Sequence, residues 1–167
     1  VTIVAGVPVR VNGSLYNCAA VISNGSLRGI VPKIHLPSYN EFYETRWFSS
    51  GSDFLYKADT AMAPVYDDAK NCSTPMAGAE IEYAGFKVNV YPNMLFQVGK
   101  STFAVEICED LWTPIPPSSH HALAGADIIV NLSASNEILM KHQYRKSIIS
   151  QLTSRTISAY IYSSCGY

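Results

Sequence analysis

Charge is scarce in this sequence. Only 15% of its 167 residues are Asp, Glu, Lys or Arg, whereas an ordinary soluble domain has roughly 25%. The net charge is −1 and the 12 Lys and Arg residues are scattered, so the sequence lacks the basic patch that binds nucleic acid. Hydrophobic residues make up 48%. We therefore expect a globular chain with a sizeable core that buries surface against a partner, either further copies in a homo-oligomer or more of the same polypeptide.

Long apolar runs are missing as well. No segment approaches the roughly 18 apolar residues that cross a membrane, and no charged-then-apolar leader precedes a cleavage site, so we expect a cytoplasmic protein without a membrane partner. Both ends resemble interrupted strands, Val1–Val4 at the start and the run from Ile157 at the end. Because natural domain termini more often trail off in polar residues, we expect the sequence to be an excerpt of a longer protein.

Familiar metal, nucleotide and hydrolase motifs are absent. The sequence contains four cysteines, Cys18, Cys72, Cys108 and Cys165. They form no CxxC pair and the four histidines have no HExxH spacing, so we expect free thiols and no metal site. A Gly-Lys-Ser tripeptide at 99–101 resembles the end of a phosphate-binding loop, but Met94 occupies the position of its first glycine. The GxSxG motif of serine hydrolases is also missing.

Strand and helix patterns alternate along the chain. Short runs of apolar and β-branched residues predict strands, and wider apolar spacing predicts helices. The predicted strands cover residues 15–23, 27–34, 101–107, 126–132 and 157–163, and the predicted helices cover residues 118–124 and 138–155. An Asn24-Gly25 hairpin turn separates the first two strands. This alternation predicts a mixed α/β layered sandwich, and the unpatterned stretch 49–80 is expected to be a surface insertion.

Two residues at the ends of predicted strands carry reactive groups. Cys108 follows the apolar strand 101–107 and precedes the acidic pair 109–110. A thiol at a strand end is exposed at the sheet edge, where backbone N–H groups of the next turn can stabilise an oxyanion; a buried free cysteine is the alternative. Lys33 follows Pro32 at the end of another strand and either points inward or is a solvated loop lysine. The two residues lie 75 positions apart, so only the fold can bring them together.

Three segments resemble, in the same order, the motifs of one enzyme family. Residues 31–48 (VPKIHLPSYNEFYETRWF) are similar to the lysine loop of the nitrilase, or carbon–nitrogen hydrolase, superfamily. Residues 106–112 (EICEDLW) resemble its nucleophile segment, and residues 131–145, which begin NLSAS, continue the match. Within the superfamily the sequence is most similar to the amidase domains of glutamine-dependent NAD synthetases. The resemblance covers most of the chain except about residues 49–80.

The resemblance implies an αββα sandwich, incomplete at both ends, that carries a Glu-Lys-Cys triad. Cys108 would be the nucleophile that attacks the side-chain amide of L-glutamine, and Lys33 would stabilise the oxyanion of the tetrahedral intermediate. Glu41, eight residues after Lys33, would be the second glutamate of the superfamily and would orient the lysine. The glutamate that serves as general base in the family precedes the lysine loop and has no counterpart in these 167 residues, so we expect the segment alone to be inactive.

The resemblance also implies how glutamine is held. Tyr39, Glu109, Ser135 and Lys141 would bind it, with the acidic side chain facing the α-ammonium group and the basic one facing the α-carboxylate. Released ammonia would pass to a synthetase domain, absent from this sequence, that uses ATP and Mg²⁺ to amidate deamido-NAD to NAD, so no cofactor is expected in this segment. Two alternatives stay open: a stand-alone amidase of the same superfamily, and a catalytically inactive nitrilase-like assembly module.

Overall fold

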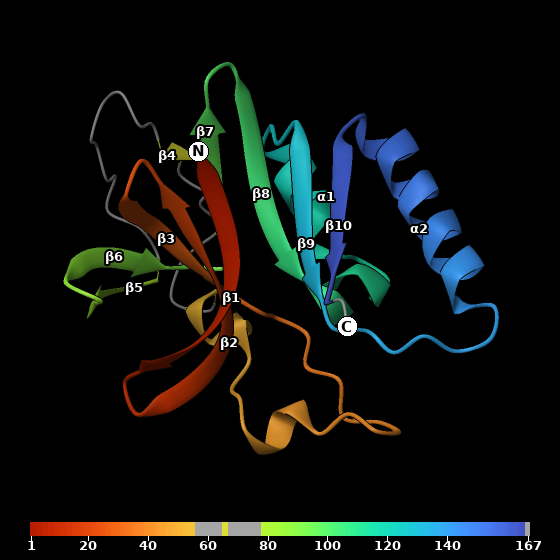
Figure 1. Ribbon diagram of the computed structural model, residues 1–167, viewed down its shortest axis with the longest axis horizontal. Coiled ribbons are helices and arrows are strands. Elements are labelled where there is room, and N and C mark those ends of the chain that lie inside the picture. The colour runs from red at the N-terminus through yellow and green to blue at the C-terminus, as the bar shows by residue number, and fades with distance from the viewer. Residues whose placement is uncertain (56–64, 67–77, 166–167) are drawn as a thin grey trace.

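Two β-sheets packed face to face form the body of the molecule in the computed structural model, which describes residues 1–55, 65–66 and 78–165 (Figure 1). The strand order is β1-β2-β3-β6-β5 in the first sheet and β10-β9-β8-β7-β4 in the second. The first sheet comprises β1 (Thr2–Val11), β2 (Ser14–Ser23), β3 (Ser26–Pro32), β5 (Ala79–Tyr83) and β6 (Phe86–Val90). The second comprises β4 (Val65–Tyr66), β7 (Leu95–Val98), β8 (Ser101–Ile107), β9 (Ile128–Ser133) and β10 (Ala159–Ser164).

Within the described residues, α-helices flank only the second sheet (Figure 1). Helix α1 (Pro117–Leu123) packs on β8, and α2 (Lys141–Thr156) packs on α1 and β10. Three short 3₁₀ helices complete the elements: η1 (Glu44–Arg46), η2 (Gly51–Phe54) and η3 (Cys108–Trp112). The mixed α/β sandwich predicted from the sequence is confirmed, here with one helical layer beside two sheets.

Two Asn-Gly turns connect the first three strands of the first sheet. Asn12 and Gly13 join β1 to β2 with φ angles of 49° and 87°, and Asn24 and Gly25 join β2 to β3 with φ angles of 51° and 74°. Positive φ at both central residues is the signature of the type I′ hairpin turn, whose twist matches that of the flanking strands. The hairpin predicted at Asn24-Gly25 is confirmed. Pro8 is accommodated in β1 because this strand lies at the sheet edge.

The second sheet brings three strand ends to one edge. Strands β8, β9 and β10 run parallel, with α1 and α2 as the crossover connections. Ile107 pairs with Leu132, and Leu132 pairs with Ser163. Because parallel strands end at the same edge of a sheet, Cys108, directly after β8, lies where β9 and β10 also end.

Successive side chains of β8 point to opposite faces of the second sheet and pack in two separate hydrophobic clusters. Phe103 and Val105 are buried between the two sheets, whereas Ala104 packs with Ile129 on the helix side of the second sheet. Glu106 is two positions after Ala104, so its side chain also points towards the helices. The alternation of side chains along β8 therefore determines which residues near its end can face the space between the sheets.

The predicted elements agree with the structure to within a few residues. The strand at 101–107 coincides with β8, and the helix expected over 138–155 is α2. Helix α2 begins later than predicted because Met140 has φ +70° and cannot continue a right-handed helix. The strand expected over 27–34 ends at Pro32 in β3, because the chain turns into the loop that carries Lys33.

The stretch 49–80, expected to be a surface insertion, is described in part. Its beginning forms η2, where Phe54 is buried in the core between the sheets. Further on, β4 pairs with β7. Residues 56–64 and 67–77, the larger part of the expected insertion, lie outside the described residues.

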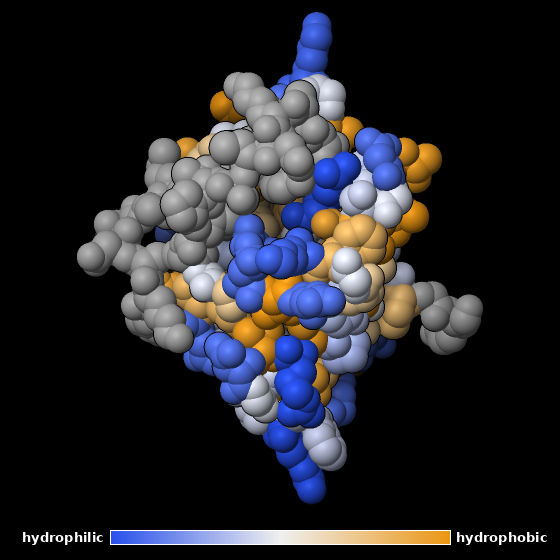
Figure 2. Space-filling view, turned by 90° about the vertical axis from the view of Figure 1, so that its left-hand side faces the viewer, coloured by the Kyte–Doolittle hydropathy of each residue, from blue (hydrophilic) through white to orange (hydrophobic). Residues whose placement is uncertain are grey.

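The surface reflects the low charge content. Figure 2, which views the left-hand side of Figure 1, shows hydrophobic surface at the centre of this face between hydrophilic residues. Large apolar side chains such as Leu123, Leu139 and Ile157 are also exposed. Over the described ranges, the structure contains no helix with the length and apolar character that a membrane crossing requires.

Candidate active site

The backbone of Lys33 is held from two sides where β3 ends. Its N–H donates to the carbonyl of Asn17 on β2 at 2.8 Å, and its carbonyl accepts the N–H of Gly51 at 2.7 Å. A Cβ at position 51 would lie 2.8 Å from the Lys33 carbonyl oxygen, so this close approach requires glycine. With its backbone fixed in this way, Lys33 is only 2% exposed and directs its side chain into a cavity.

The buried ammonium of Lys33 is paired with Glu44. Lys33 Nζ donates to Glu44 Oε2 at 2.5 Å, and Glu44 Oε1 accepts the side-chain amide of Asn17 at 2.7 Å. The Glu44 N–H donates to the carbonyl of Pro37 at 3.2 Å, which turns the loop back so that the carboxylate faces the lysine. A buried charge needs such a partner because leaving it unpaired costs several kcal/mol.

The carboxylate that orients Lys33 is therefore Glu44, which corrects the expectation for Glu41. Glu41 is exposed, and its carboxylate accepts the side-chain amide of Asn136 instead. The two glutamates are only three positions apart, but η1 begins at Glu44 and points this residue alone towards the lysine.

Cys108 occupies a sharp turn at the end of β8. Its φ angle is +50°, a left-handed conformation that costs a non-glycine residue on the order of 1 kcal/mol. Its N–H donates to Asn131 Oδ1 on the neighbouring strand β9 at 3.1 Å. The turn leaves the thiol half-buried at the sheet edge, while the bond to Asn131 fixes the backbone that carries it.

A buried carboxylate holds Asn131 in turn. Asn131 Nδ2 donates to Glu106 Oε1 at 3.5 Å, and the hydroxyl of Tyr160 donates to the same oxygen. Glu106 Oε2 accepts the backbone N–H of Ser118, the second residue of α1, at 2.9 Å. Burial raises the pKa of Glu106. Because this side chain lies on the helix side of the sheet, it supports the Cys108 backbone from behind and is not a base facing the thiol.

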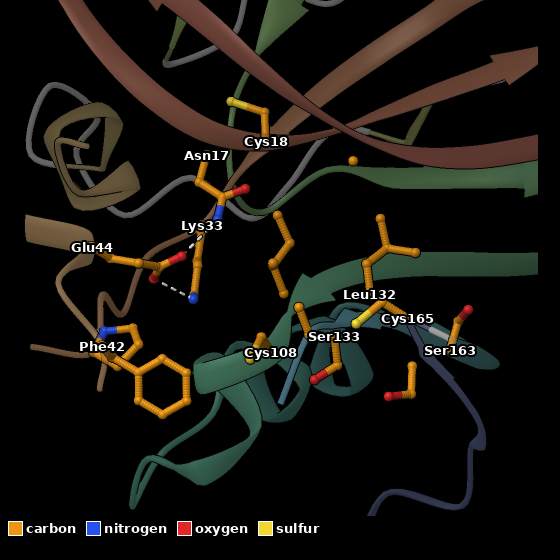
Figure 3. Close-up of a pocket in the computed structure, with 15 residues that line it drawn as sticks. Asn17, Cys18, Lys33, Phe42, Glu44, Cys108, Leu132, Ser133, Ser163 and Cys165 are labelled. Atoms are coloured by element: carbon orange, nitrogen blue, oxygen red, sulfur yellow. Dashed lines mark hydrogen bonds and ion pairs between the residues drawn. The ribbon is translucent and has the colours of Figure 1, made fainter. Parts of the chain in front are cut away.

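Lys33 and Cys108 line the same cavity, although they come from different sheets. The cavity measures about 450 Å³, within the usual range for small-molecule sites. Figure 3 shows both side chains directed towards it, with Glu44 beside the ammonium group. Ser133 and Phe42 also contribute to its wall. Among the lining residues in the described ranges, Glu44 is the one carboxylate, and it is already bound to Lys33.

Tyr39 and Glu109, two of the expected substrate-binding residues, bind each other. The Tyr39 hydroxyl donates to both carboxylate oxygens of Glu109 at 2.9 and 3.0 Å. Burial, and then the contact with Glu109, raise the pKa of Tyr39 to about 12, so the phenol stays a donor at neutral pH. The rings of Tyr39 and Phe42 pack edge to face with their centres 5.8 Å apart, and Phe42 lines the cavity. The pair therefore lies next to the cavity wall.

Lys141 and Ser135, the other two expected substrate-binding residues, lie after β9. Lys141 Nζ donates to Asn136 Oδ1 and lies 5.3 Å from the centre of the Trp112 ring. Asn136 thereby connects Lys141 to Glu41, which accepts from its Nδ2. Ser135 is half-buried and follows Ala134, which lines the cavity.

Sequence reasoning missed the residues that hold the two reactive groups in place. Glu44 stands inside the loop identified from the sequence, but a choice between two glutamates needed the position of η1. Asn17 and Asn131 sit within strands, where a polar residue gives no sign of its partner. Asp110 was noted only as part of an acidic pair. No group of three His, Cys, Asp or Glu side chains arranged to hold a metal ion is found in the described part of the chain.

Known proteins match this chain in sequence. The sequence model of a family described as carbon–nitrogen hydrolase matches residues 1–159. Glutamine-dependent NAD(+) synthetase from Mycobacterium tuberculosis is 32% identical over 167 residues, which cover 98% of this chain and 21% of the relative. The enzyme of the same name from Homo sapiens is 26% identical over 156 residues, covering 93% of this chain and 20% of the relative. The chain thus spans about a fifth of the length of these curated relatives.

Solved structures show the same likeness. A glutamine-dependent NAD(+) synthetase from Cytophaga hutchinsonii superimposes with a TM-score of 0.71 at 26% identity, covering 98% of this chain and 23% of that one. A carbon–nitrogen hydrolase superfamily protein from Xanthomonas campestris, solved with an arsenic adduct in its active site, gives a TM-score of 0.54 at 11% identity. That match covers 98% of this chain and 47% of the other and bears on the fold alone.

Proposed function

Because the chain belongs to the carbon–nitrogen hydrolase family, we propose that it is the glutaminase part of a glutamine-dependent NAD synthetase. In this proposal it hydrolyses the side-chain amide of L-glutamine through a thioester on Cys108. The ammonia then serves the ATP-dependent amidation of deamido-NAD to NAD by a synthetase domain elsewhere in the polypeptide. The names of the relatives with 26–32% identity support this assignment.

The observation that carries the proposal is the shared cavity of Lys33 and Cys108. A thiol and a buried ammonium around one space can supply the nucleophile and an oxyanion donor for amide hydrolysis. The pairing of Lys33 with Glu44 at 2.5 Å fixes the position of the ammonium group. An electrostatic partner of this kind stabilises a transition state without reorganising during the reaction.

The first chemical step forms the thioester. Cys108 Sγ attacks the carboxamide carbon of glutamine, and the carbonyl electrons move onto oxygen. Lys33 Nζ and the backbone N–H of Glu109 bind this oxyanion, and one such donor is typically worth about 3 kcal/mol. The thiol proton passes to a carboxylate base, which by family resemblance lies outside these 167 residues. When the intermediate collapses, the C–N bond breaks, and the nitrogen takes up a proton and leaves as ammonia.

The second step regenerates the enzyme. A water molecule attacks the thioester carbon, with the same base accepting its proton, and a second oxyanion forms at the position stabilised by Lys33. Collapse of this intermediate breaks the C–S bond, releases glutamate and returns the proton to the sulfur of Cys108. Glu44 takes no part in proton transfer in this scheme, since both its oxygens are engaged by Lys33 and Asn17.

The proposed recognition of glutamine rests on opposite charges beside the cavity. Glu109, held by Tyr39, would bind the α-ammonium group. Lys141, held by Asn136, would bind the α-carboxylate, and Ser135 would add a hydrogen bond. A stand-alone amidase acting on simple amides needs neither charge, so glutamine and butyramide are the substrates to compare.

Labelling tests the proposal. The full-length protein is treated with a diazo-ketone analogue of glutamine, and its peptides are mapped by mass spectrometry. We expect label on Cys108, loss of glutaminase activity in proportion, and protection by glutamine. A label on Cys165, which also lines the cavity, or full activity after labelling of Cys108, contradicts the proposed nucleophile. Turnover of butyramide as fast as glutamine favours the stand-alone amidase, and no reaction with either favours an inactive assembly module.

A further inference from the structure

A single buried carboxylate connects the lysine loop with the nucleophile segment. Asp110 is 2% exposed. Its Oδ1 accepts the backbone N–H of His35 at 2.8 Å, and its Oδ2 accepts the backbone N–H of Ile107 at 3.0 Å. His35 is two residues after Lys33, and Ile107 directly precedes Cys108. Each carboxylate oxygen therefore holds the backbone beside one of the two reactive side chains.

These two backbones belong to different layers of the molecule. The lysine loop follows β3 of the first sheet, and the nucleophile follows β8 of the second sheet. Between sheets the contact is packing of side chains, which does not fix a distance as firmly as a hydrogen bond between backbone and a rigid short side chain. Asp110 makes hydrogen bonds of this kind to both layers, through the N–H groups of His35 and Ile107. These bonds lie beside the two side chains whose relative position matters to the chemistry.

We propose that Asp110 is a positioning residue that sets the separation between the Lys33 ammonium and the Cys108 thiol. The proposal rests on the glutaminase function proposed above. In that reaction Sγ must reach the amide carbon while Nζ reaches the oxygen bonded to that carbon, so the two groups must be spaced to fit a single carbonyl. A misplacement of about 1 Å can lower a rate by about 100-fold.

The contacts of Asp110 fit this role and not that of a base. Both of its oxygens are occupied by N–H donors, and its own carbonyl accepts the hydroxyl of Thr113 at 3.0 Å, which fixes the turn that carries it. Burial raises the pKa of Asp110 to about 7, against the opposing effect of the two N–H donors and of Lys33, while nearby Glu106 raises it further. An amide in its place would present an NH₂ group to one of the two N–H groups. Two donors cannot bond to each other, so one of the two hydrogen bonds would be lost.

The experiment compares two reactions of the same thiol in the full-length protein. Hydrolysis of glutamine needs Lys33 at the oxyanion. Alkylation of Cys108 by iodoacetamide is a direct displacement that forms no oxyanion, so it reports thiol ionisation and access alone. For Asp110→Asn we expect kcat for glutamine hydrolysis to fall at least about tenfold, with KM and the Cys108 alkylation rate within about twofold of the unaltered protein. General loss of structure would change both reactions together.

Asp127→Asn is the matched control. Asp127 Oδ2 accepts the backbone N–H of Thr102 at 2.8 Å, so the same substitution removes the same kind of bond at the opposite end of β8. We expect this variant to keep kcat within about twofold. A second pair, His35→Pro and His35→Ala, tests the lysine-loop bond from the donor side. Both lose the imidazole, but only proline lacks the N–H, so only His35→Pro should lose kcat.

Several outcomes overturn the proposal. An unchanged kcat in folded Asp110→Asn would show that the spacing does not depend on this carboxylate. Equal falls in kcat and in alkylation would make its role structural, as would loss of the fold in both Asp110→Asn and His35→Pro. Failure of the glutaminase assignment is a separate result, because the unaltered protein would then not hydrolyse glutamine. If only the positioning role fails, the unaltered protein hydrolyses glutamine normally.

Discussion

At the scale of single residues, the site depends on how each reactive side chain is held. Lys33 is buried and bound to Glu44, and Cys108 adopts a strained φ angle of +50° that Asn131 supports. Lys33 and Cys108 stand out in the sequence at strand ends, and the family resemblance, not the local pattern, implies their roles. Their partners were not predicted, because Asn131 comes from a different strand than Cys108. Glu44 could not be told from Glu41 without the position of η1.

Glu44 provides the sharpest test at this scale. Glu44→Gln removes the charge that faces the buried Lys33 ammonium, so we expect a loss of stability of about 3 kcal/mol and a fall in glutaminase kcat of at least about tenfold. Glu41→Gln is the matched control, since Glu41 is exposed and contacts Asn136. We expect this variant to keep its stability. The measurements are thermal unfolding and steady-state glutaminase kinetics of the full-length protein.

The assignment of Glu44 would be contradicted by the reverse pattern. If Glu41→Gln lost kcat while Glu44→Gln kept it, the earlier glutamate would orient the lysine during catalysis, whatever the contact in the resting protein.

At the scale of elements, strand patterns were readable and loop geometry was not. The strand at 101–107 was predicted with its observed bounds, because its apolar run is short and ends at polar residues. The start of α2 was predicted too early, because apolar spacing does not reveal that Met140 has φ +70°. The position of Glu44 in η1 was not predicted for the same reason, because a single 3₁₀ turn gives no periodic pattern in the sequence.

Helix α1 brings a pH-dependent term to the stability of the second sheet. His121 of this helix is buried, and burial, opposed by the backbone of Pro92, lowers its pKa to about 4. The unfolded chain, with an ordinary histidine pKa of about 6.5, therefore binds more protons than the folded chain between these values. Stability from this group is complete above pH 6.5 and is lost as the pH falls towards 4.

A variant that cannot titrate isolates this effect. Compared with His121→Met, we expect the unaltered protein to lose about 2–3 kcal/mol between pH 7 and pH 4.5, measured as the free energy of opening by hydrogen exchange at the amides of β8. Asp110 and Glu106 have raised pKa values and act in the opposite direction, but they are common to both proteins. Parallel pH curves for the two proteins would contradict the burial of a neutral imidazole.

At the scale of the whole molecule, packing of two sheets forms the cavity that Lys33 and Cys108 both line. The chain covers about a fifth of its curated relatives, and apolar residues such as Leu139 and Ile157 are more than nine-tenths exposed. The expectation from composition that a partner covers such surface stays a prediction. The fold class was predictable from alternating strands and helices, whereas the meeting of Lys33 and Cys108 required the two sheets to pack.

The structure of full-length Cys108→Ala with glutamine bound tests the central claim most directly. Removal of the thiol prevents turnover and leaves room for the substrate. We predict that the side-chain carboxamide lies beside position 108, with its oxygen about 3 Å from Lys33 Nζ and Glu44 still bound to that ammonium. Glutamine bound elsewhere, or a carboxamide oxygen turned away from Lys33, would contradict the account.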